Sequence, residues 1–421
     1  MPFRFVHAAD IHLDSPLRTL ALREAALAEL VGGATRRAFV AIVDLCLAER
    51  VDALLIAGDL YDGDQTSMKT ARFLADQLRR LHEAGISSYV IRGNHDAESR
   101  ITRELVLPDS VKVFGGRADV VLHAAGALDV AIHGISFAQK HAPESLLTKF
   151  REPRPGAVNI GLLHTSLGGS AAHDRYAPCA PADLHGSGFA YWALGHVHQR
   201  SVEQGRATIV MPGNPQGRDI NEAGPKSATL VTIDDGGAIA VEERPTAIAE
   251  FRRVAVDLAG AGDWRAAVGR IERALEAARA ATSSEHLVAR LILEGATPLA
   301  WRLRSDADLI EEEARRIGAD LGGAWLDTIE IRCREPLAGA GGGADPVAEL
   351  RLLMETEVAG SKAFRDELQS IAEDLRGHLP PGAREDLFGA DAEGFAEALG
   401  VIAREGADDV LAFLRAADRE A

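Results

Sequence analysis

The stretch GNHD at residues 93–96 puts an amide, an imidazole and a carboxylate next to one another. The run SSYVI at 87–91, just before it, has the β-branched and aromatic character of a buried strand. We therefore expect a strand that ends in a tight turn carrying Asn94, His95 and Asp96. An ordinary turn would explain these residues, because glycine and asparagine tolerate positive φ and aspartate caps the next segment. The rest of the chain has to decide between a turn and a reactive site.

Other apolar runs end in residues of the same kinds. They are FRFVHAADIH (3–12), ALLIAGDLYD (53–62), VNIGLLH (158–164), YWALGHVH (191–198) and TIVMPGN (208–214). Their ends supply Asp10, His12, Asp59, Asp62, His164, His196 and His198. Each residue has an ordinary explanation, and a lone histidine such as His164 is more often a core residue than a ligand. Because they recur at the same point of successive strand–loop units, we interpret them as one site.

Helical patterns at residues 35–50 and 67–83 separate the first three runs. This alternation predicts an α/β domain whose site lies at the carboxyl ends of the strands. Asp10 and His12 are two residues apart, as are His196 and His198. Since side chains alternate along a strand, we expect both members of each pair to face the same side of an extended segment.

The residue types fit a centre of two divalent metal ions. Two dications about 3.5–4 Å apart repel each other, so an anionic carboxylate has to bridge them. Asp59, directly after Gly58, is the candidate bridge, and Asn94 adds a neutral carbonyl oxygen that limits the charge of the site. Mixed oxygen and imidazole ligands favour manganese, iron or zinc over magnesium, and we expect manganese.

The blocks DIH, GDLYD, GNHD, the isolated His164 and GHVH resemble, in order and separation, the signature blocks of the calcineurin-like metallophosphoesterases. The resemblance implies a sandwich of two mixed sheets flanked by helices. It also implies that Asp10, His12, Asp59 and His198 hold one metal, while Asp59, Asn94, His164 and His196 hold the other. His95 would then stabilise or protonate the leaving oxygen, with Asp62 or Asp96 orienting it.

Further blocks narrow the resemblance. Serine/threonine phosphatases carry an arginine after the second aspartate of their second block, and GDLYDGD at 58–64 has none. HAADIHLDSPL, YWALGHVHQR and MPGNPQGRDINEAGPKSATLV are instead similar to the SbcD-type DNA repair nucleases, especially the YhaO-like branch. This resemblance is strong over residues 1–245 and weak beyond them. It implies a DNA substrate, a small capping module and C-terminal helices that grip a coiled-coil ATPase of the SbcC type.

Candidate substrate contacts are less specific. Arg218, Arg100 and Arg103 could contact the DNA backbone, although each could equally be a solvated surface residue. His173, with its neighbours Asp174 and Tyr176, is expected on a loop near the site, where an ordinary turn is the alternative. His7 lies inside the first strand, and we interpret it as a histidine of the core or behind the ligands.

Composition is typical of a globular protein, with 421 residues, 47% hydrophobic and 26% charged. The net charge of −17 at first argues against a nucleic-acid partner. Counting residues shows where it lies: 25 Lys/Arg against 29 Asp/Glu in 1–245, 13 against 16 in 246–344, and 8 against 18 in 345–421. Two bound dications would therefore bring the first segment close to neutral. The start shows no apolar leader and no run could cross a bilayer, so we expect a cytoplasmic protein without a membrane partner.

The pattern changes near residue 245. Strand-like and helical stretches at 246–338 indicate a small α+β capping module, GAGGGADP at 339–346 a flexible linker, and 347–421 an acidic helical tail. The tail could bind a partner or could be a set of solubilising surface helices. The three cysteines, Cys46, Cys179 and Cys333, are far apart and are interpreted as free thiols.

We conclude from the sequence that the chain is a two-metal phosphodiesterase acting on DNA, working with an SbcC-like ATPase and able to form a homodimer. One alternative is a metallophosphoesterase for a small phosphodiester or nucleotide. Another is a scaffold that binds metal or a partner without turnover, which the full set of expected ligands disfavours. A third is a DNA-end tether whose activity depends on the ATPase.

Overall fold

The computed structural model describes residues 2–15, 25–61, 67–97, 106–125, 128–139, 142–168, 176–336, 346–379, 384, 387–389 and 391–420. The chain forms two compact units, which are described separately. The first comprises Met1–Arg253, Ala278–Ala289 and Gly323–Trp325, and the second comprises Val254–Ala277, Arg290–Gly322 and Leu326–Ala421. Of the helices within these ranges, none combines the length and the hydropathy needed to cross a bilayer.

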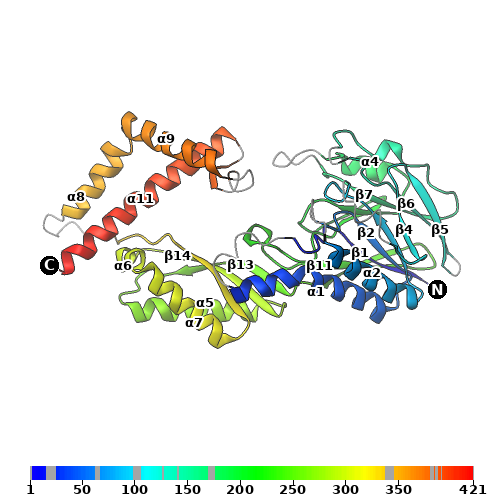
Figure 1. The fold of residues 1–421 in the computed structure, drawn as a ribbon, viewed down its shortest axis with the longest axis horizontal. Coiled ribbons are helices and arrows are strands. Elements are labelled where there is room, and N and C mark those ends of the chain that lie inside the picture. The colour runs from blue at the N-terminus through cyan, green and yellow to red at the C-terminus, as the bar shows by residue number, and fades with distance from the viewer. Residues whose placement is uncertain are drawn as a thin grey trace. The chain divides into compact units, whose positions relative to one another are not determined.

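The first unit contains two six-stranded mixed sheets (Figure 1). The first sheet has the order β12-β11-β1-β2-β3-β4, with bounds β1 Phe3–Ala8, β2 Ala53–Ala57, β3 Ser87–Ile91, β4 Val111–Val113, β11 Ser227–Ile233 and β12 Ile239–Pro245. The second has the order β5-β6-β7-β8-β10-β9, with bounds β5 Asp119–Ala125, β6 Leu128–Gly134, β7 Val158–His164, β8 Tyr191–Gly195, β9 Ser201–Gln204 and β10 Thr208–Met211.

Strands β1 to β4 run parallel, as do β6, β7, β8 and β10. Their carboxyl ends therefore carry the predicted motifs, and the expected α/β sandwich of two mixed sheets is confirmed.

The space between the sheets is filled by large apolar side chains from both inner faces. Phe5 and Leu55 come from the first sheet, and Ile160, Leu162 and Tyr191 come from the second. All five are fully buried. This core fixes the two sheets against each other, so the loops at their carboxyl ends have a rigid base.

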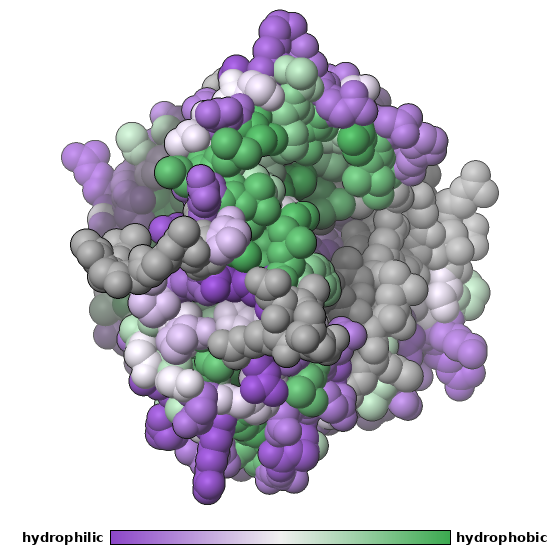
Figure 2. All heavy atoms as spheres, turned by 90° about the vertical axis from the view of Figure 1, so that its left-hand side faces the viewer, coloured by the Kyte–Doolittle hydropathy of each residue, from purple (hydrophilic) through white to green (hydrophobic). Residues whose placement is uncertain are grey.

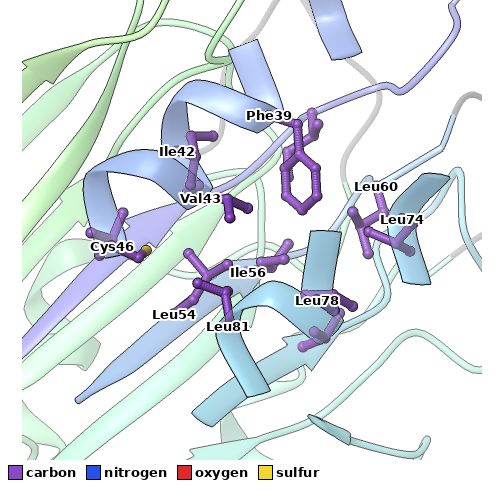
Figure 3. Packing of buried hydrophobic residues seen from close by; sticks show 14 of the residues in the cluster. Phe39, Ile42, Val43, Cys46, Leu54, Ile56, Leu60, Leu74, Leu78 and Leu81 are labelled. Atoms are coloured by element: carbon purple, nitrogen blue, oxygen red, sulfur yellow. The ribbon is translucent and has the colours of Figure 1, made fainter. Parts of the chain in front are cut away.

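Helices α1 (Ala25–Glu49) and α2 (Met68–Glu83) cover the outer face of the first sheet. Figure 3 shows side chains of α1 such as Phe39 and Val43 packing against Ile56 of β2 and against Leu74 and Leu78 of α2. The outer face of the second sheet packs against the short helix α4 (Pro181–Gly186). The central parallel strands of each sheet are therefore buried on both faces, as parallel strands require.

The third sheet has the order β13-β14-β15, with bounds β13 Ala249–Asp257, β14 His286–Glu294 and β15 Ala324–Ile331. Its connections contain helices α5 (Trp264–Ala280), α6 (Ala300–Ser305) and α7 (Ala307–Leu321). Helix α5 is capped by Asp263, whose Oδ1 accepts from the amide of Ala266 at 2.8 Å. The small α+β module expected after residue 245 is thus observed as an arrangement of elements, while its exact boundaries stay predictions.

The C-terminal part of the second unit consists of helices α8 (Pro346–Leu353), a π-helical turn (Met354–Val358), α9 (Lys362–His378) and α11 (Ala392–Glu420). Helix α9 is capped by Ser361, whose Oγ accepts from the amide of Phe364 at 3.2 Å. Arg304 of α6 pairs with Asp408 and Asp409 of α11 at 3.4 and 3.3 Å. Most of the predicted linker at 339–346 lies outside the described residues.

Candidate metal centre

Six of the seven predicted ligands lie in loops after strands, and His164 is the last residue of β7. β1 ends at Ala8 and β8 ends at Gly195, so both histidine-containing pairs follow the strands. Asp10, His12, Asp59 and His196 have φ of 52°, 46°, 52° and 104°. The expectation that strand alternation aligns each pair was therefore wrong. Left-handed backbone turns direct these side chains, a strained conformation that clusters at functional sites.

The first ligand group consists of Asp10, His12 and His198, whose ligand atoms all lie within 4.8 Å of one another. The Nε2 atoms of His12 and His198 are 3.2 Å apart, and His198 Nε2 is 3.9 Å from Asp10 Oδ1. Asp10 and His12 are almost completely buried. Such a set of two imidazoles and a carboxylate suits a divalent transition metal.

The second group consists of Asp59, His164 and His196. His164 Nε2 also lies 3.0 Å from the amide oxygen of Asn94 and 3.3 Å from Asp59 Oδ2. With a neutral imidazole these three atoms are all acceptors. A proton or a metal cation must lie among them, so the donor set fits a second metal.

Charge in this cluster is balanced between acids and bases. Burial raises the pKa of Asp10 despite the histidines near it. Burial alone would also raise the pKa of Asp59, but His164 lowers it well below the ordinary value. Burial would lower the pKa of His164, and the negative charge of Asp59 overcomes this and raises it to about 9. Without metal, a proton thus occupies the position where a cation would be bound.

The two groups are connected through backbone amides. The amide of His196 donates to both carboxylate oxygens of Asp10 at 3.0 Å, and the amide of His95 donates to Asp59 Oδ1 at 3.0 Å. Each group therefore contains an acid that also holds a neighbouring loop in place. This arrangement makes the two ligand groups parts of one centre.

Glycines leave the room that His164 needs. Its Nδ1 donates to the carbonyl of Ala57 at 2.9 Å, which leaves Nε2 free to accept. A Cβ atom at Gly93 would lie 2.1 Å from Asp59 Oδ1, and one at Gly195 would lie 2.1 Å from the carbonyl oxygen of Ala57. Neither position can carry a side chain without displacing this arrangement. Gly93 belongs to the GNHD motif, but its steric role was not foreseen.

His95 lies next to the first ligand group, with its ring centroid 5.1 Å from that of His12. Asp96, by contrast, accepts from the amides of Leu60, Tyr61 and Gly93 at 3.1, 3.0 and 3.2 Å. Burial raises the pKa of Asp96 to about 6. The carboxylate of Asp96 therefore shapes the loops after β2 and β3, and its orienting role toward His95 stays a prediction.

Arg218, a candidate for contact with the DNA backbone, lies beside the metal ligands, and its contact with DNA stays a prediction. Its Nη2 donates to Glu222 Oε1 at 2.6 Å and is 3.3 Å from His198 Nδ1. Three further predicted residues that could contact substrate and one that could orient His95 lie outside the described residues: Arg100, Arg103, His173 and Asp62. Tyr176 is described, and its ring lies 5.2 Å from that of His196.

His7 is a fully buried core residue, one of the two roles expected for it. It contacts the Tyr191 hydroxyl and the carbonyl of Leu194, each at 3.0 Å. Burial lowers the pKa of His7 to about 3.

Glu222 is a residue of the site that was not predicted, although it lies in the block quoted from residues 211–231. It lies in a 3₁₀ turn (Ile220–Glu222), and its Oε1 is 2.7 Å from His198 Nδ1. Burial would raise its pKa, but the histidine and Arg218 hold it well below the ordinary value. The rule that metal-binding histidines have an acceptor at their second nitrogen could have prompted a search for such an acid.

Comparison with known proteins agrees with this geometry. Residues 3–200 match the family Calcineurin-like phosphoesterase, and residues 251–334 match the family Metallophosphoesterase YhaO, middle domain. The chain is 33% identical over 311 residues to the uncharacterized metallophosphoesterase YhaO of Bacillus subtilis (strain 168), covering 73% of this chain and 75% of that protein.

More distant similarity extends to archaeal proteins named DNA double-strand break repair protein Mre11. That of Methanocaldococcus jannaschii is 28% identical over 208 residues, covering 48% of this chain and 52% of that protein. That of Sulfurisphaera tokodaii is 28% identical over 219 residues, covering 50% and 54%. The chain thus spans about half the length of these two relatives.

Three findings agree on the family of this chain. The two matched families follow in the expected order, one relative aligns over most of both chains, and two ligand groups lie at the carboxyl ends of the strands. The chain belongs to the calcineurin-like metallophosphoesterases, a family of metal-dependent phosphoester hydrolases with a dimetal centre.

Proposed function

We propose that this chain is a two-metal phosphodiesterase that cleaves DNA, a nuclease subunit of the SbcD type. The observation that carries the proposal is the pair of adjoining ligand groups, each with one carboxylate and two imidazoles. The similarity to proteins named for DNA double-strand break repair supports DNA as the substrate.

Residue roles follow from the contacts. Asp10, His12 and His198 would hold one ion, Asp59, Asn94, His164 and His196 the other, and Asp59 would bridge both. The ions, when bound, activate water and neutralise charge on the phosphoryl oxygens. His95 lies beside the first ligand group and is held by its amide to Asp59. By resemblance to the family, its ring would face the leaving oxygen.

The donor set supports manganese as the metal, with iron or zinc as alternatives. Four of the seven proposed ligands are imidazoles. Five of the seven are almost completely buried, namely Asp10, His12, Asp59, Asn94 and His164. Magnesium prefers oxygen ligands and keeps several waters, so a buried centre rich in imidazole suits it poorly.

A partner is proposed for the C-terminal helices, namely a coiled-coil ATPase of the SbcC type. Apolar side chains on them are exposed, among them Leu352 of α8 (60%), Ile371 of α9 (60%) and Phe413 of α11 (61%). A groove of about 700 Å³ among α8, α9 and α11 is lined by Phe364 and Leu368. Figure 2 shows apolar surface gathered on the face where these helices lie. Exposed patches of this kind mark binding surfaces. A homodimer, by contrast, is proposed on the family resemblance alone.

The test is cleavage of linear double-stranded and single-stranded DNA by metal-stripped protein reloaded with manganese or magnesium. We expect manganese-dependent cleavage that His95→Ala lowers by about 10²-fold or more while both metals stay bound. His82→Ala, at an exposed histidine on α2, is the matched control and should cleave as wild type does.

Two other results would favour a function different from DNA cleavage. Hydrolysis of small chromogenic diesters without DNA cleavage would favour a small phosphodiester substrate. No turnover of either, with two metals bound, would leave a binding scaffold or an enzyme that needs its ATPase, which adding the ATPase distinguishes.

A further inference from the structure

The carboxylate of Glu222 accepts several hydrogen bonds next to the metal ligands. It accepts from His198 Nδ1 at 2.7 Å, from the Arg218 backbone amide at 2.8 Å and from Arg218 Nη2 at 2.6 Å. The side-chain amide of Asn214 donates to its Oε2 at 2.8 Å. A carboxylate with this many donors cannot rotate away from His198 without breaking several bonds at once.

Its contact determines which nitrogen of His198 carries the proton. A carboxylate is an acceptor only, so His198 Nδ1 must carry hydrogen and Nε2 is left with a lone pair. That lone pair points toward the first ligand group, because Nε2 is the atom 3.2 Å from His12 Nε2. A negative charge behind the ring also makes Nε2 a stronger donor to a cation.

The corresponding position in the second group is different. His164 Nδ1 donates to a backbone carbonyl, that of Ala57, which is a neutral acceptor. The second nitrogen of His198 thus contacts a charged glutamate, whereas that of His164 contacts a neutral carbonyl. Removing the glutamate should therefore affect one metal much more than the other.

Hydrogen bonds join the 3₁₀ turn of Glu222, and the loop just before it, to the start of β13. Gln216, almost completely buried, accepts from the amide of Ile248 at 2.8 Å and donates to the carbonyl of Ala249 at 2.7 Å. Arg253 donates to the carbonyl of Ile220 at 2.9 Å. The position of Glu222 is therefore set by residues next to and within the segment that matches the YhaO middle domain.

We propose that Glu222, locked by Arg218 and Asn214, is a positioning residue that holds His198 in its metal-binding tautomer and so tunes the affinity of the first metal site. This inference rests on the proposed dimetal centre. It gives Arg218 a role behind the ligands in place of a contact with DNA.

The test is titration of metal-free protein with manganese, followed by calorimetry and by electron paramagnetic resonance. Glu222→Gln keeps the shape and loses the charge, while Glu222→Ala removes the acceptor. His198→Ala and His164→Ala assign the two binding events. Glu203→Gln is the matched control, because Glu203 pairs with His185 at 3.1 Å on the exposed strand β9, away from the ligands.

We expect Glu222→Ala to weaken the site lost in His198→Ala by about 10–100-fold, with Glu222→Gln intermediate and the other site within about threefold. The coupled spectrum of a manganese pair should give way to that of single ions, and Glu203→Gln should match wild type.

Two outcomes would overturn the inference: unchanged affinity at both sites in both Glu222 variants, or equal loss at both sites with a lower melting temperature, which indicates a merely structural role. Wild type that binds two manganese ions without cleaving DNA would contradict only the proposed nuclease function. Wild type that binds none would contradict the dimetal centre itself.

Discussion

Gly93 occupies the most crowded position of the metal centre. Its φ is not positive, so the constraint is space alone: an added Cβ would lie 2.1 Å from Asp59 Oδ1 and 2.7 Å from His164 Cε1. We expect Gly93→Ala to displace Asp59 and to abolish binding of at least one metal, with about 1–3 kcal/mol lower stability. Manganese titration and chemical denaturation measure both effects.

The control for this substitution is Gly115→Ala. Gly115 is exposed after β4 and has nothing within 4 Å of an added Cβ. It should bind manganese as wild type does. Normal metal binding by Gly93→Ala would show that the loops after β2 and β3 can move apart without loss of the centre.

His7 provides a prediction about pH that is separate from the metal ligands. Burial lowers its pKa to about 3 in the folded chain, whereas an unfolded histidine has a pKa near 6.5. Between these values the unfolded chain takes up a proton that the folded chain does not, so the free energy of unfolding falls as pH falls below about 6.5. The contribution is nil above about pH 7 and roughly 2 kcal/mol of lost stability at about pH 5.

The measurement is urea denaturation of metal-free wild type and His7→Gln at several pH values. The difference in unfolding free energy between the two should shrink by roughly 2 kcal/mol from about pH 7.5 to about pH 5. His82→Gln, at an exposed position of α2, should run parallel to wild type. A constant difference between wild type and His7→Gln would mean that His7 is protonated in the folded chain.

At the level of single residues, the types of the ligands were easier to predict than their conformations. The motif residues Asp10, Asp59 and His164 were recognisable because only a few side chains bind metals. The left-handed backbone of Asp10 and Asp59 was not, since it depends on the loops being held against one another, as by the bond from the amide of Asp10 to the carbonyl of Gly58 at 3.0 Å. Glu222 was missed because its partner His198 is 24 residues away and meets it only in the fold.

At the level of elements, the connection between the turn of Glu222 and β13 can be broken at Gln216. Gln216→Ala would leave the buried amide of Ile248 and the carbonyl of Ala249 without this partner. Each unsatisfied buried group costs about 1–3 kcal/mol, so we expect a loss of roughly 2–6 kcal/mol in unfolding free energy. Manganese affinity of the His198 site should fall as well, because Glu222 loses its support.

Gln204→Ala, on the exposed strand β9, is the control for Gln216→Ala and should change stability by less than about 0.5 kcal/mol. Urea denaturation and manganese titration of both variants give the comparison. If Gln216→Ala lowered stability and left manganese affinity unchanged, the turn would keep its shape without β13.

Helices and strands were predicted best where local signals were complete. β3 and β7 have the expected bounds, and α2 begins one residue after its expected start, because complete apolar patterns define them. Helix α1 was expected over residues 35–50 and begins at Ala25, despite the helix-weakening Gly32 and Gly33. Leu27 and Val31 of this first part pack against Phe251 and Val288, so tertiary burial outweighs local propensity.

At the level of the whole molecule, metal binding should stabilise one compact unit and not the other. All the proposed ligands belong to the first unit, and Asp10 and Asp59 keep two carboxylates buried there within one cluster. An ion that binds the folded unit alone stabilises it by about 2.7 kcal/mol at a free concentration of about 100 Kd. For a unit of this size that corresponds to a rise in melting temperature of roughly 5–10 °C.

Calorimetry should therefore show two transitions, of which manganese moves one and a chelator moves it back. Asp59→Asn should remove the shift, because it takes away the bridging charge, and the metal-free variant should melt lower than wild type, because the buried His164 loses the carboxylate that stabilises its proton. Asp235→Asn, in the turn between β11 and β12, is the charge-matched control and should keep the shift. A manganese shift of both transitions would contradict the assignment of the ligands to the first unit, since the second unit would then also bind the ion.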